Sequence, residues 1–324
     1  MKLDRRCLSL GMVAALCWTF STIAFAQDFP SKTIRMIVPY PAGGPADSLA
    51  RAVGPAMSDA LGQPVVIENR AGASGTTGVD AVAKSEPNGY TIAMSGPGAL
   101  VAAPFMIKVP YDATKDLAPI ARLAEVNSVI VVAASSPYKT LGDLVAAARA
   151  APGKITFGSA GAGTLTHLAG ELLNIEGKIK LLHVPYRGAA PAAADLLGGH
   201  IQVALQDLPG VISQINAGSM RVLAVTSEHR SPALPNVPTT GEAGFPNVLS
   251  DSWYGIIGPA GTPRAVQQKL FDAVAASVKK PEVVEQIARL GAFVALSTPE
   301  AFSATIAQEQ KRWKRVIDET GARM

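Results

Sequence analysis

The sequence contains almost no cysteine. Its only two cysteines, Cys7 and Cys17, lie close to the N-terminus of the 324-residue chain. The chain beyond them cannot form a disulfide, supply a thiol nucleophile or build a cysteine-based metal site. Its stability must come from buried apolar side chains, which a chain of about 300 residues can provide.

Charged residues are also scarce. They make up 17% of the sequence, and the formal net charge is only +4. No basic run is interleaved with aromatic residues, so we expect no nucleic-acid partner. Beyond residue 26 no uninterrupted apolar run reaches the roughly 18 residues typical of a membrane helix, so the sequence predicts no span there.

Local catalytic motifs are missing too. The sequence has no G-x-S-x-G, no H-E-x-x-H and no G-x-x-x-x-G-K-[ST], and its four histidines show no metal-ligand spacing. Residues 161–166 begin like a dinucleotide fingerprint, but Thr166 stands where the third glycine belongs. We therefore expect no enzyme, no cofactor and no metal. A periplasmic hydrolase with scattered catalytic residues is a less favoured alternative.

The N-terminal segment has the features of a secretory signal peptide. Basic residues at positions 2, 5 and 6 precede an apolar stretch that ends in Ala24-Phe25-Ala26. This order predicts residues 1–26 as a signal peptide cleaved after Ala26. Export combined with a cysteine-free mature chain favours a bacterial periplasm.

Short β-like runs alternate with alanine-rich helical runs in the first half of the mature chain. Residues 32–40, 64–70 and 89–95 are predicted strands, whereas residues 46–62 and 75–85 are predicted helices. Strands separated by helices of about ten or more residues predict a parallel, doubly wound α/β sheet.

The same alternation recurs in the second half. Its expected elements are strand 127–134, helix 139–153, strand 154–159, helix 164–174, strand 180–186, helix 189–199, strand 200–207, helix 208–218 and strand 220–227. A proline-rich loop, residues 231–247, then precedes a strand from residue 251 and helices that begin near residues 263 and 299.

Two such series predict two α/β domains. We expect one domain of residues 27–125 plus 250–324 and a second of residues 126–249. The chain would cross between them twice, near residues 120–132 and 248–258. Two crossovers form a hinge, which suits closure around a ligand.

Two glycine-rich turns stand at corresponding places in the two series. Residues 36–50 (MIVPYPAGGPADSLA) and 155–169 (ITFGSAGAGTLTHLA) each combine a strand, a turn and a helix start. A helix start offers unpaired N–H groups and partial positive charge to an anion. Ligands of open α/β sheets bind beyond the carboxyl ends of the strands. The two turns therefore predict a site between the domains for a small ligand with one or two carboxylates.

Several polar residues near these turns have two interpretations. Asp47 either caps its helix or contacts the ligand, and His167 either packs in the first helical turns or lines the cleft. Asp207, at the end of a strand, either caps the next helix or meets a ligand amino group. Tyr186 and Arg187 either pack at the domain surface or contact the ligand.

Six segments stand in a diagnostic order. They are residues 38–51 (VPYPAGGPADSLAR), 65–92, 158–173 (GSAGAGTLTHLAGELL), 184–205, 217–246 and 253–263 (WYGIIGPAGTP). They are landmarks of a similarity that extends over essentially the whole mature chain, which resembles the periplasmic receptors of tripartite tricarboxylate transporters, also called Bug proteins. The resemblance implies a two-domain, periplasmic-binding-protein (Venus flytrap) fold with no catalytic activity.

The resemblance also implies which residues hold the ligand. Carried over by position, they are Tyr40, Ala42, Gly43, Gly44, Asp47, Ser74, Ser95, Ser159, Gly161, Ala162, Gly163, Thr164 and Asp207. Gly43 and Gly44 are expected to donate backbone N–H groups, and Ser159 and Thr164 to add hydroxyls. Asp207 occupies the position where members that bind amino acids can place an acid.

The implied partners are a small carboxylate and separate membrane transporter subunits. The carboxylate classes are di- or tricarboxylates, acidic amino acids and aromatic acids, and the receptor is expected to act as a monomer. An alternative is a sensor module that presents the bound ligand to a membrane histidine kinase. The same fold suits both roles, and only the partner differs.

Overall fold

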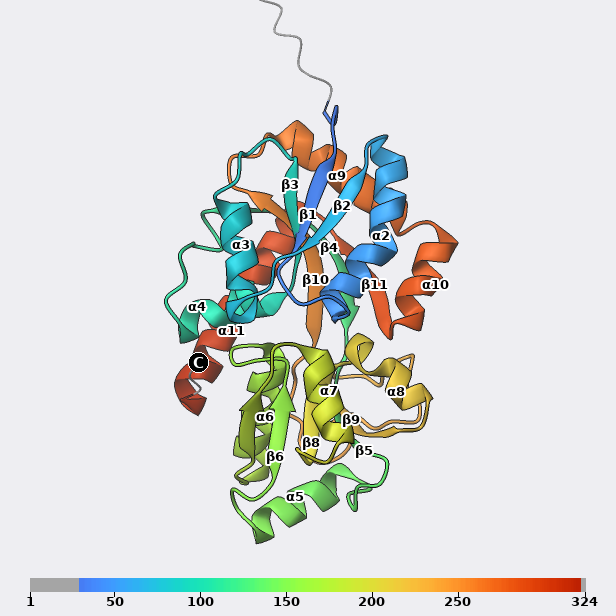
Figure 1. Ribbon diagram of the computed structural model, residues 1–324. Helices are drawn as coiled ribbons and strands as arrows, with labels where there is room; N and C mark the ends of the chain where they lie inside the picture. The colour runs from blue at the N-terminus through green and yellow to red at the C-terminus, as the bar shows by residue number, and fades with distance from the viewer. Residues whose placement is uncertain (1–28, 322–324) are drawn as a thin grey trace, which may run out of the picture.

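The computed structural model describes residues 29–321, which form two lobes joined by crossing segments (Figure 1). The expected signal peptide, residues 1–26, lies outside the described residues. One lobe is built on a six-stranded sheet and the other on a five-stranded sheet. Helices cover both faces of each sheet, so the predicted α/β architecture with two doubly wound lobes is confirmed.

The six-stranded sheet has the order β11-β4-β10-β3-β1-β2. Its strands are β1 (Ile34–Val38), β2 (Val65–Asn69), β3 (Thr91–Ser95), β4 (Leu117–Val126), β10 (Ser252–Pro259) and β11 (Ala292–Ser297). Strand β1 pairs in parallel with β2 and β3, whereas β10 runs antiparallel to both β3 and β4. The parallel part therefore lies at one side of the sheet.

Two groups of helices enclose this sheet (Figure 1). One face packs against α2 (Pro45–Leu61), α9 (Arg264–Ser277) and α10 (Pro281–Arg289). The other face packs against α3 (Thr76–Ala83), the π-helical turn η2 (Gly98–Ala102), α4 (Ala103–Met106) and α11 (Pro299–Thr320). The short 3-10 turn η1 (Ala73–Gly75) precedes α3.

The five-stranded sheet has the order β7-β6-β8-β5-β9. Its strands are β5 (Ser128–Ala133), β6 (Thr156–Ser159), β7 (Leu182–Pro185), β8 (Val203–Asp207) and β9 (Met220–Val225). Helices α5 (Leu141–Ala150) and α6 (Leu165–Gly177) pack on one face. Helix α7 (Ala189–Leu197) and α8 (Ile212–Asn216) pack on the other, and the 3-10 turn η3 (Leu208–Gly210) follows β8.

The chain passes between the two sheets twice. It leaves β4 at Val126 and enters β5 at Ser128, and it returns from β9 to β10 through residues 226–251. The lobes also share an apolar cluster, because Leu165 and Leu168 of α6 pack in the same core as Trp313 of α11. Helix α11, the last helix of the first lobe, therefore also packs against the second lobe.

Several helix boundaries follow the expected local chemistry. Thr140 and Asp143 form a reciprocal capping box at the start of α5, and Gly62 ends α2 in a left-handed conformation, as glycine favours. Thr298 caps α11 with its side chain. The next helix, α9, begins at Arg264 without a side-chain cap, and the nearby Thr262 donates its hydroxyl to the Pro259 carbonyl.

The structure differs from the predicted elements in three places. The sheets are mixed rather than wholly parallel, because strands that return from the other lobe enter in the opposite direction. Strands β4 and β11, the helical segment η2 with α4, and helix α10 were not expected as elements. The predicted helix 208–218 is divided into η3 and the short α8, which fits the position of Pro209.

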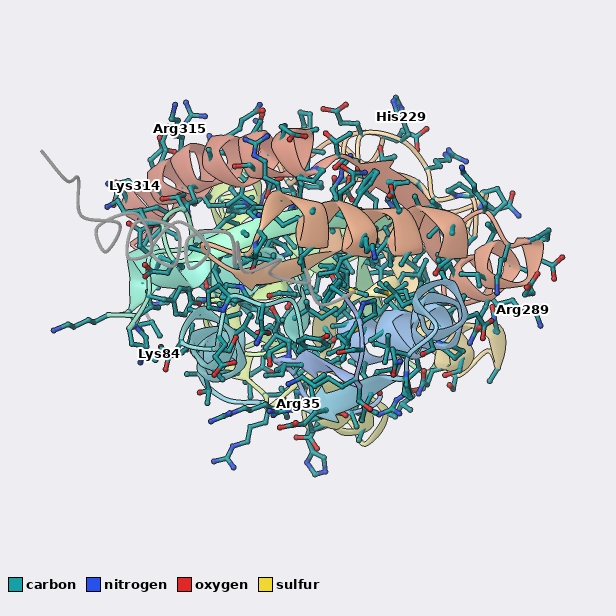
Figure 2. The ribbon with its side chains drawn as sticks, turned by 90° about the horizontal axis from the view of Figure 1, so that it is seen from above. Arg35, Lys84, His229, Arg289, Lys314 and Arg315 are labelled. Carbon is teal, nitrogen blue, oxygen red and sulfur yellow. The ribbon has the colours of Figure 1, made fainter. Side chains whose placement is uncertain are left out.

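Long charged side chains lie on the outside of the molecule. Seen from above in Figure 2, Arg35, Lys84, Arg289, Lys314 and Arg315 all point away from the interior, and each is exposed. Among residues 29–321, no helix combines the length and apolar character that a membrane crossing needs.

The contact between α6 and β6 leaves no room for a larger residue at Gly170. A Cβ at that position would lie 2.2 Å from Cε2 of Phe157. We expect Gly170→Ala to lower the free energy of unfolding by about 1–3 kcal/mol, the usual cost of overpacking, as measured by urea denaturation.

The matched control is Gly142→Ala in the first turn of α5. A Cβ there would meet only the Thr140 hydroxyl, at an ordinary 3.6 Å, so stability should be unchanged or slightly higher. Equal effects of the two substitutions would contradict the predicted packing.

Candidate functional site

A cavity of about 610 Å³ lies between the two lobes. Most of its lining residues fall within the segments that follow the carboxyl ends of β1, β2, β3, β6 and β7, namely residues 39–46, 71–75, 96–98, 160–166 and 186–191. The others are the last two residues of β8, Gln206 and Asp207, and Ser252 and Tyr254 of β10. The cavity therefore lies where open α/β sheets bind their ligands.

Most of the expected ligand-binding residues meet at this cavity. Those that line it are Tyr40, Ala42, Gly44, Ser74, Gly161, Ala162, Thr164 and Asp207. Tyr186 and Arg187, whose roles the sequence left open, line it as well. The remaining expected residues lie outside the lining; they are Gly43, Asp47, Ser95, Ser159 and Gly163.

Asp47 stabilises the first glycine-rich turn, between β1 and α2, without lining the cavity. Its carboxylate accepts hydrogen bonds from Gly43 N (2.9 Å), Asn69 Nδ2 (2.9 Å) and Arg51 Nε (3.0 Å). Burial opposes ionisation, but the bonds from Arg51, Gly43 and Asn69 outweigh it and lower the pKa of Asp47. The Gly43 N–H, expected to donate to a ligand, is therefore already used within the turn.

Helix α2 begins at the cavity without a side-chain cap. Its N-cap residue is Gly44, and Pro45 at the first helical position has no N–H. Within the described part of the chain, the N–H groups of Ala46 and Asp47 have no acceptor. The positive end of the helix is thus left available at the cavity wall.

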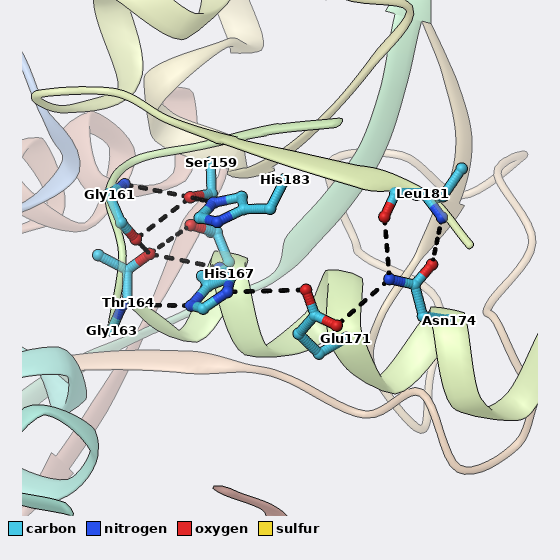
Figure 3. Close-up of polar contacts among 10 residues, drawn as sticks. Ser159, Gly161, Gly163, Thr164, His167, Glu171, Asn174, Leu181 and His183 are labelled. Atoms are coloured by element: carbon cyan, nitrogen blue, oxygen red, sulfur yellow. Dashed lines mark hydrogen bonds and ion pairs between the residues drawn. The ribbon is translucent and has the colours of Figure 1, made fainter. Parts of the chain in front are cut away.

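The second turn is closed by hydrogen bonds among its own residues (Figure 3). The Thr164 hydroxyl donates to the Gly161 carbonyl (2.7 Å) and accepts from the N–H of His167 (3.3 Å), so Thr164 caps α6. The Ser159 hydroxyl, fully buried, accepts from Gly161 N at 3.2 Å. Ser159 and Thr164 therefore shape the turn, and only Thr164 also reaches the cavity.

Two stacked histidines that do not line the cavity support this turn (Figure 3). The ring centroids of His167 and His183 lie 3.9 Å apart. Nδ1 of His167 accepts from Gly163 N (3.3 Å), and Nε2 of His183 lies 2.7 Å from Oγ of Ser159. Of the two interpretations of His167, the structure favours packing within the first helical turns.

Both imidazoles are held in the neutral form. Burial lowers the pKa of His167 to about 4. Burial and the neighbouring His167 lower the pKa of His183 to about 3. Two stacked imidazolium rings at this distance would repel each other, so protonation opposes the folded arrangement.

Asp207 joins the lobes next to the cavity. Its carboxylate accepts hydroxyl hydrogen bonds from Ser128 (2.7 Å), Ser252 (2.9 Å) and Tyr254 (2.7 Å). Burial raises the pKa of Asp207, although these three bonds act against the rise. It makes no side-chain cap to η3, so the capping interpretation of Asp207 is wrong.

The lobes touch at two places beside the cavity. At one, the Ser74 hydroxyl donates to the Ala162 carbonyl, and Ser74 itself has a left-handed φ of 54°. At the other, the N-cap of α7 meets the first turn, because a Cβ at Gly188 would lie 3.2 Å from Cγ of Pro41. The cavity is therefore bounded by direct contacts between the lobes.

The donor set does not suit a metal ion. Among residues 29–321, no three histidine, cysteine or acidic side chains gather closely enough to hold one. The charged residues in the cavity lining are Arg187 and Asp207. The cavity wall is thus made of helix starts, backbone and a few polar side chains, with one residue of each charge.

The family model of the tripartite tricarboxylate transporter family receptor matches residues 49–322. The chain belongs to this family. Its members and its structural neighbours are binding proteins rather than enzymes. Among curated relatives, BugT of Bordetella pertussis is 35% identical over 326 residues, covering 100% of both chains.

Solved structures of similar proteins have the same fold. Periplasmic binding protein BugD is 34% identical with a TM-score of 0.86, covering 91% of this chain and 99% of its own. MatC from Rhodopseudomonas palustris with bound malate is 30% identical with a TM-score of 0.84, covering 89% and 100%. An R. palustris protein with adipate is 31% identical with a TM-score of 0.88, covering 92% and 100%.

The histidine pair should make the stability of this receptor depend on pH. Because the folded-state pKa values lie below the ordinary value of 6.5, the unfolded chain binds more protons between pH 6.5 and about 4. The contribution is fully present above pH 6.5 and is lost as the pH falls. We expect a loss on the order of 3 kcal/mol for each ring over this range, measured by urea denaturation at several pH values.

The substitution His183→Asn removes one of the two titrating rings. Its stability should fall less steeply below pH 6.5 than that of the wild type. The exposed His229, which lies on the surface in Figure 2, provides the control His229→Asn. Parallel curves for the wild type and His183→Asn would contradict the proposed origin of the pH dependence.

Proposed function

We propose that this receptor captures a small carboxylate in the periplasm and delivers it to the membrane subunits of a tripartite tricarboxylate-type transporter. The moving parts are the domains expected from the sequence, residues 27–125 plus 250–324 and residues 126–249. The observation that carries the proposal is a single cavity at which helices of both lobes begin with N–H groups left without acceptors.

These helix ends complement an anion. Besides Ala46 and Asp47 of α2, the N–H groups of Ala162 before α6 and of Leu165 in its first turn have no acceptor in the described part of the chain. Each terminus contributes roughly 0.3–2 kcal/mol, whereas micromolar binding needs about 8 kcal/mol. Several termini and apolar contacts with the wall must therefore act together.

The cavity wall carries little negative charge that would repel a bound acid. Its one carboxylate, Asp207, already accepts three hydroxyls, while Arg187 adds positive charge to the lining. The structures of MatC with malate and of the R. palustris protein with adipate support a carboxylate as the ligand class. A small organic acid is therefore the best match to the wall.

Closure of the lobes links binding to delivery. A ligand that contacts both turns stabilises the closed form by its higher affinity for that form. Contacts such as Ser74 to Ala162 form only when the lobes are close. The closed, loaded form is the one a transporter should recognise, and opening about the two crossovers would release the acid.

A thermal-shift screen of residues 27–324 tests the ligand class. The protein is first unfolded and refolded to remove any acid carried through purification. Mono-, di- and tricarboxylates, amino acids and aromatic acids are compared with their neutral amides. An acid at 100 times its Kd should stabilise the protein by about 2.7 kcal/mol and raise Tm by several degrees. Stabilisation by the amides alone would refute carboxylate binding.

Substitution in the second turn tests the site itself. Gly161 lines the cavity with φ of 142°, and a Cβ there would lie 3.1 Å from the Tyr186 carbonyl. A β-branched residue cannot adopt this conformation without strain, so Gly161→Val should weaken acid binding at least tenfold, measured by calorimetry.

The control Gly199→Val imposes similar backbone strain outside the cavity. Gly199 has φ of 76° and open space around its Cβ position. This variant should lose stability but keep the affinity of the wild type. Unchanged affinity in Gly161→Val would remove the second turn from the proposed site.

A further inference from the structure

A second cavity, of about 500 Å³, lies beside the segments that cross between the lobes. Its lining includes Asn127 of one crossing segment, residues 249 and 251 of the other, and residues 227–230 and 232 of the loop that follows β9. We call it the hinge cavity, and we call the cavity of about 610 Å³ the main cavity. The two share only Ser252 among their lining residues.

The floor of the hinge cavity is one face of the six-stranded sheet. Glu125 of β4 pairs in register with Trp253 of β10 on one side and with Phe293 of β11 on the other. Directly opposed residues project to the same face, so these three side chains lie side by side. Tyr254, the next residue of β10, projects to the other face and lines the main cavity. The two cavities therefore lie on different faces of β10.

Two of the arginines that line the hinge cavity are neutralised by ion pairs. Arg122 lies 2.7 Å from Glu125, which also lines the cavity. Arg230 lies 2.8 Å from Glu242, which is not among the lining residues. These two guanidinium groups therefore contribute little positive charge to the remaining lining groups.

The other charged groups leave an excess of negative charge. Among residues 29–321, the carboxylates of Glu228, Asp251 and Glu309 form no ion pair. Arg312 of α11 is the remaining guanidinium of the lining, and it donates to the Leu249 carbonyl at 2.8 Å. One cation thus faces three carboxylates without ion pairs, so the cavity favours a positively charged occupant.

The environment of two of these carboxylates supports the same conclusion. Burial raises the pKa of Glu309, although Trp253, Arg312, Trp313 and Arg122 act against the rise. Around Asp251, Glu125 and Asp207 add negative charge, whereas Arg312 is the positive group nearby. An entering cation would stabilise both carboxylates in their ionised form.

Asn127 provides an independent sign of a missing hydrogen-bond donor. Its side chain is 5% exposed, and its Nδ2 donates to Oδ1 of Asp251 at 3.4 Å. Its Oδ1 has no partner among residues 29–321, although buried amide oxygens are nearly always hydrogen-bonded. The unpaired oxygen is an acceptor, so the group that completes it must carry N–H or O–H.

Two buried donors of the lining also lack a well-aligned partner, but each has an acceptor close by. They are Nε of Arg122 and Nε1 of Trp253. Ser297 stands opposite Arg122 in the pairing of β11 with β4, and Trp253 acts on the Glu309 carboxylate. These donors therefore do not require an anionic occupant.

The size and the walls of the hinge cavity favour an organic cation over a metal ion. Among residues 29–321, no three histidine, cysteine or acidic side chains gather closely enough to hold a metal. Trp253, Phe293 and Leu249 provide apolar surface, and aromatic rings attract ammonium groups. An aliphatic chain that ends in an ammonium group matches both the apolar and the acidic parts of the lining.

An occupant of the hinge cavity would contact both lobes. Glu309 and Arg312 belong to α11 of the first lobe, whereas the loop of residues 227–232 follows β9 of the second. The Ser74 bond to Ala162 shows that the lobes are close together at the main cavity. A molecule that bridges α11 and this loop would stabilise that arrangement relative to others.

We propose that the hinge cavity binds a small aliphatic ammonium ion, held by Asp251, Glu309 and Oδ1 of Asn127, and that its binding strengthens acid binding in the main cavity. The first part is independent of the proposed function, whereas the second part rests on it. Because coupling between two sites is reciprocal, the acid must strengthen binding of the amine by the same factor.

Calorimetry on refolded residues 27–324 tests the first part with butylamine and 1,4-diaminobutane, both as hydrochlorides, and with 1-butanol as the uncharged control. At least one amine should bind the wild type, and 1-butanol should not. Asp251→Asn and Glu309→Gln each remove one carboxylate while keeping the side-chain volume. Each should weaken amine binding by about tenfold or more, the usual worth of a charge-assisted hydrogen bond.

Asp272→Asn is the matched control. It makes the same charge change at an exposed position of α9, which packs on the other face of the sheet, and it should leave amine binding unchanged. Thermal unfolding of each variant verifies that it is folded. Equal binding of butylamine and 1-butanol, or equal effects of Asp251→Asn and Asp272→Asn, would refute the ammonium site.

The second part is tested with an acid that stabilises the protein in the thermal-shift screen. Its affinity should rise about threefold or more in the presence of saturating amine, and this ratio should fall to one in Asp251→Asn. An unchanged acid affinity would refute the coupling while the ammonium site stands. If no acid binds but the amine does, the proposed function fails and the ammonium site is retained.

Discussion

The structure depends on one constraint, that backbone N–H groups at the starts of helices need acceptors. In both lobes, parallel strands end at the gap and the helices that follow them begin there. Glycine and proline in these turns supply no side-chain caps for α2 and α7. The donors therefore remain available, and the positive ends of helices from two lobes face one cavity.

Most of the polar side chains around the two glycine-rich turns stabilise the turns by hydrogen bonds and do not line the cavity. Asp47 fixes the first turn through Gly43, and His167 fixes the second through Gly163. What these turns present to the cavity is therefore mainly backbone, whereas the polar side chains of the lining include Gln206 and Arg187.

The sequence predicted the two lobes and the two turns because each is encoded locally, by alternating strands and helices and by glycine runs at strand ends. It missed β4, which contains a proline, and β11, which is short. The pairing of both strands is fixed only by strands that are distant in the sequence. The partners of Asp207 come from Ser128, Ser252 and Tyr254, far away in the chain. Likewise, the sequence does not show that the Gln206 amide has no hydrogen-bond partner among residues 29–321, because this depends on which side chains the fold brings near it.

The apolar contact between α6 and α11 has a thermodynamic consequence for the motion of the lobes. Leu165 and Leu168 begin the helix whose turn faces the cavity, and they share a core with Trp313 of the other lobe. Any opening that separates these helices exposes apolar surface to water, which raises the heat capacity of the open form. Binding coupled to closure should therefore carry a negative heat-capacity change larger than burial of a small acid alone would produce. The receptor would then close less readily in the cold, when the hydrophobic contribution weakens.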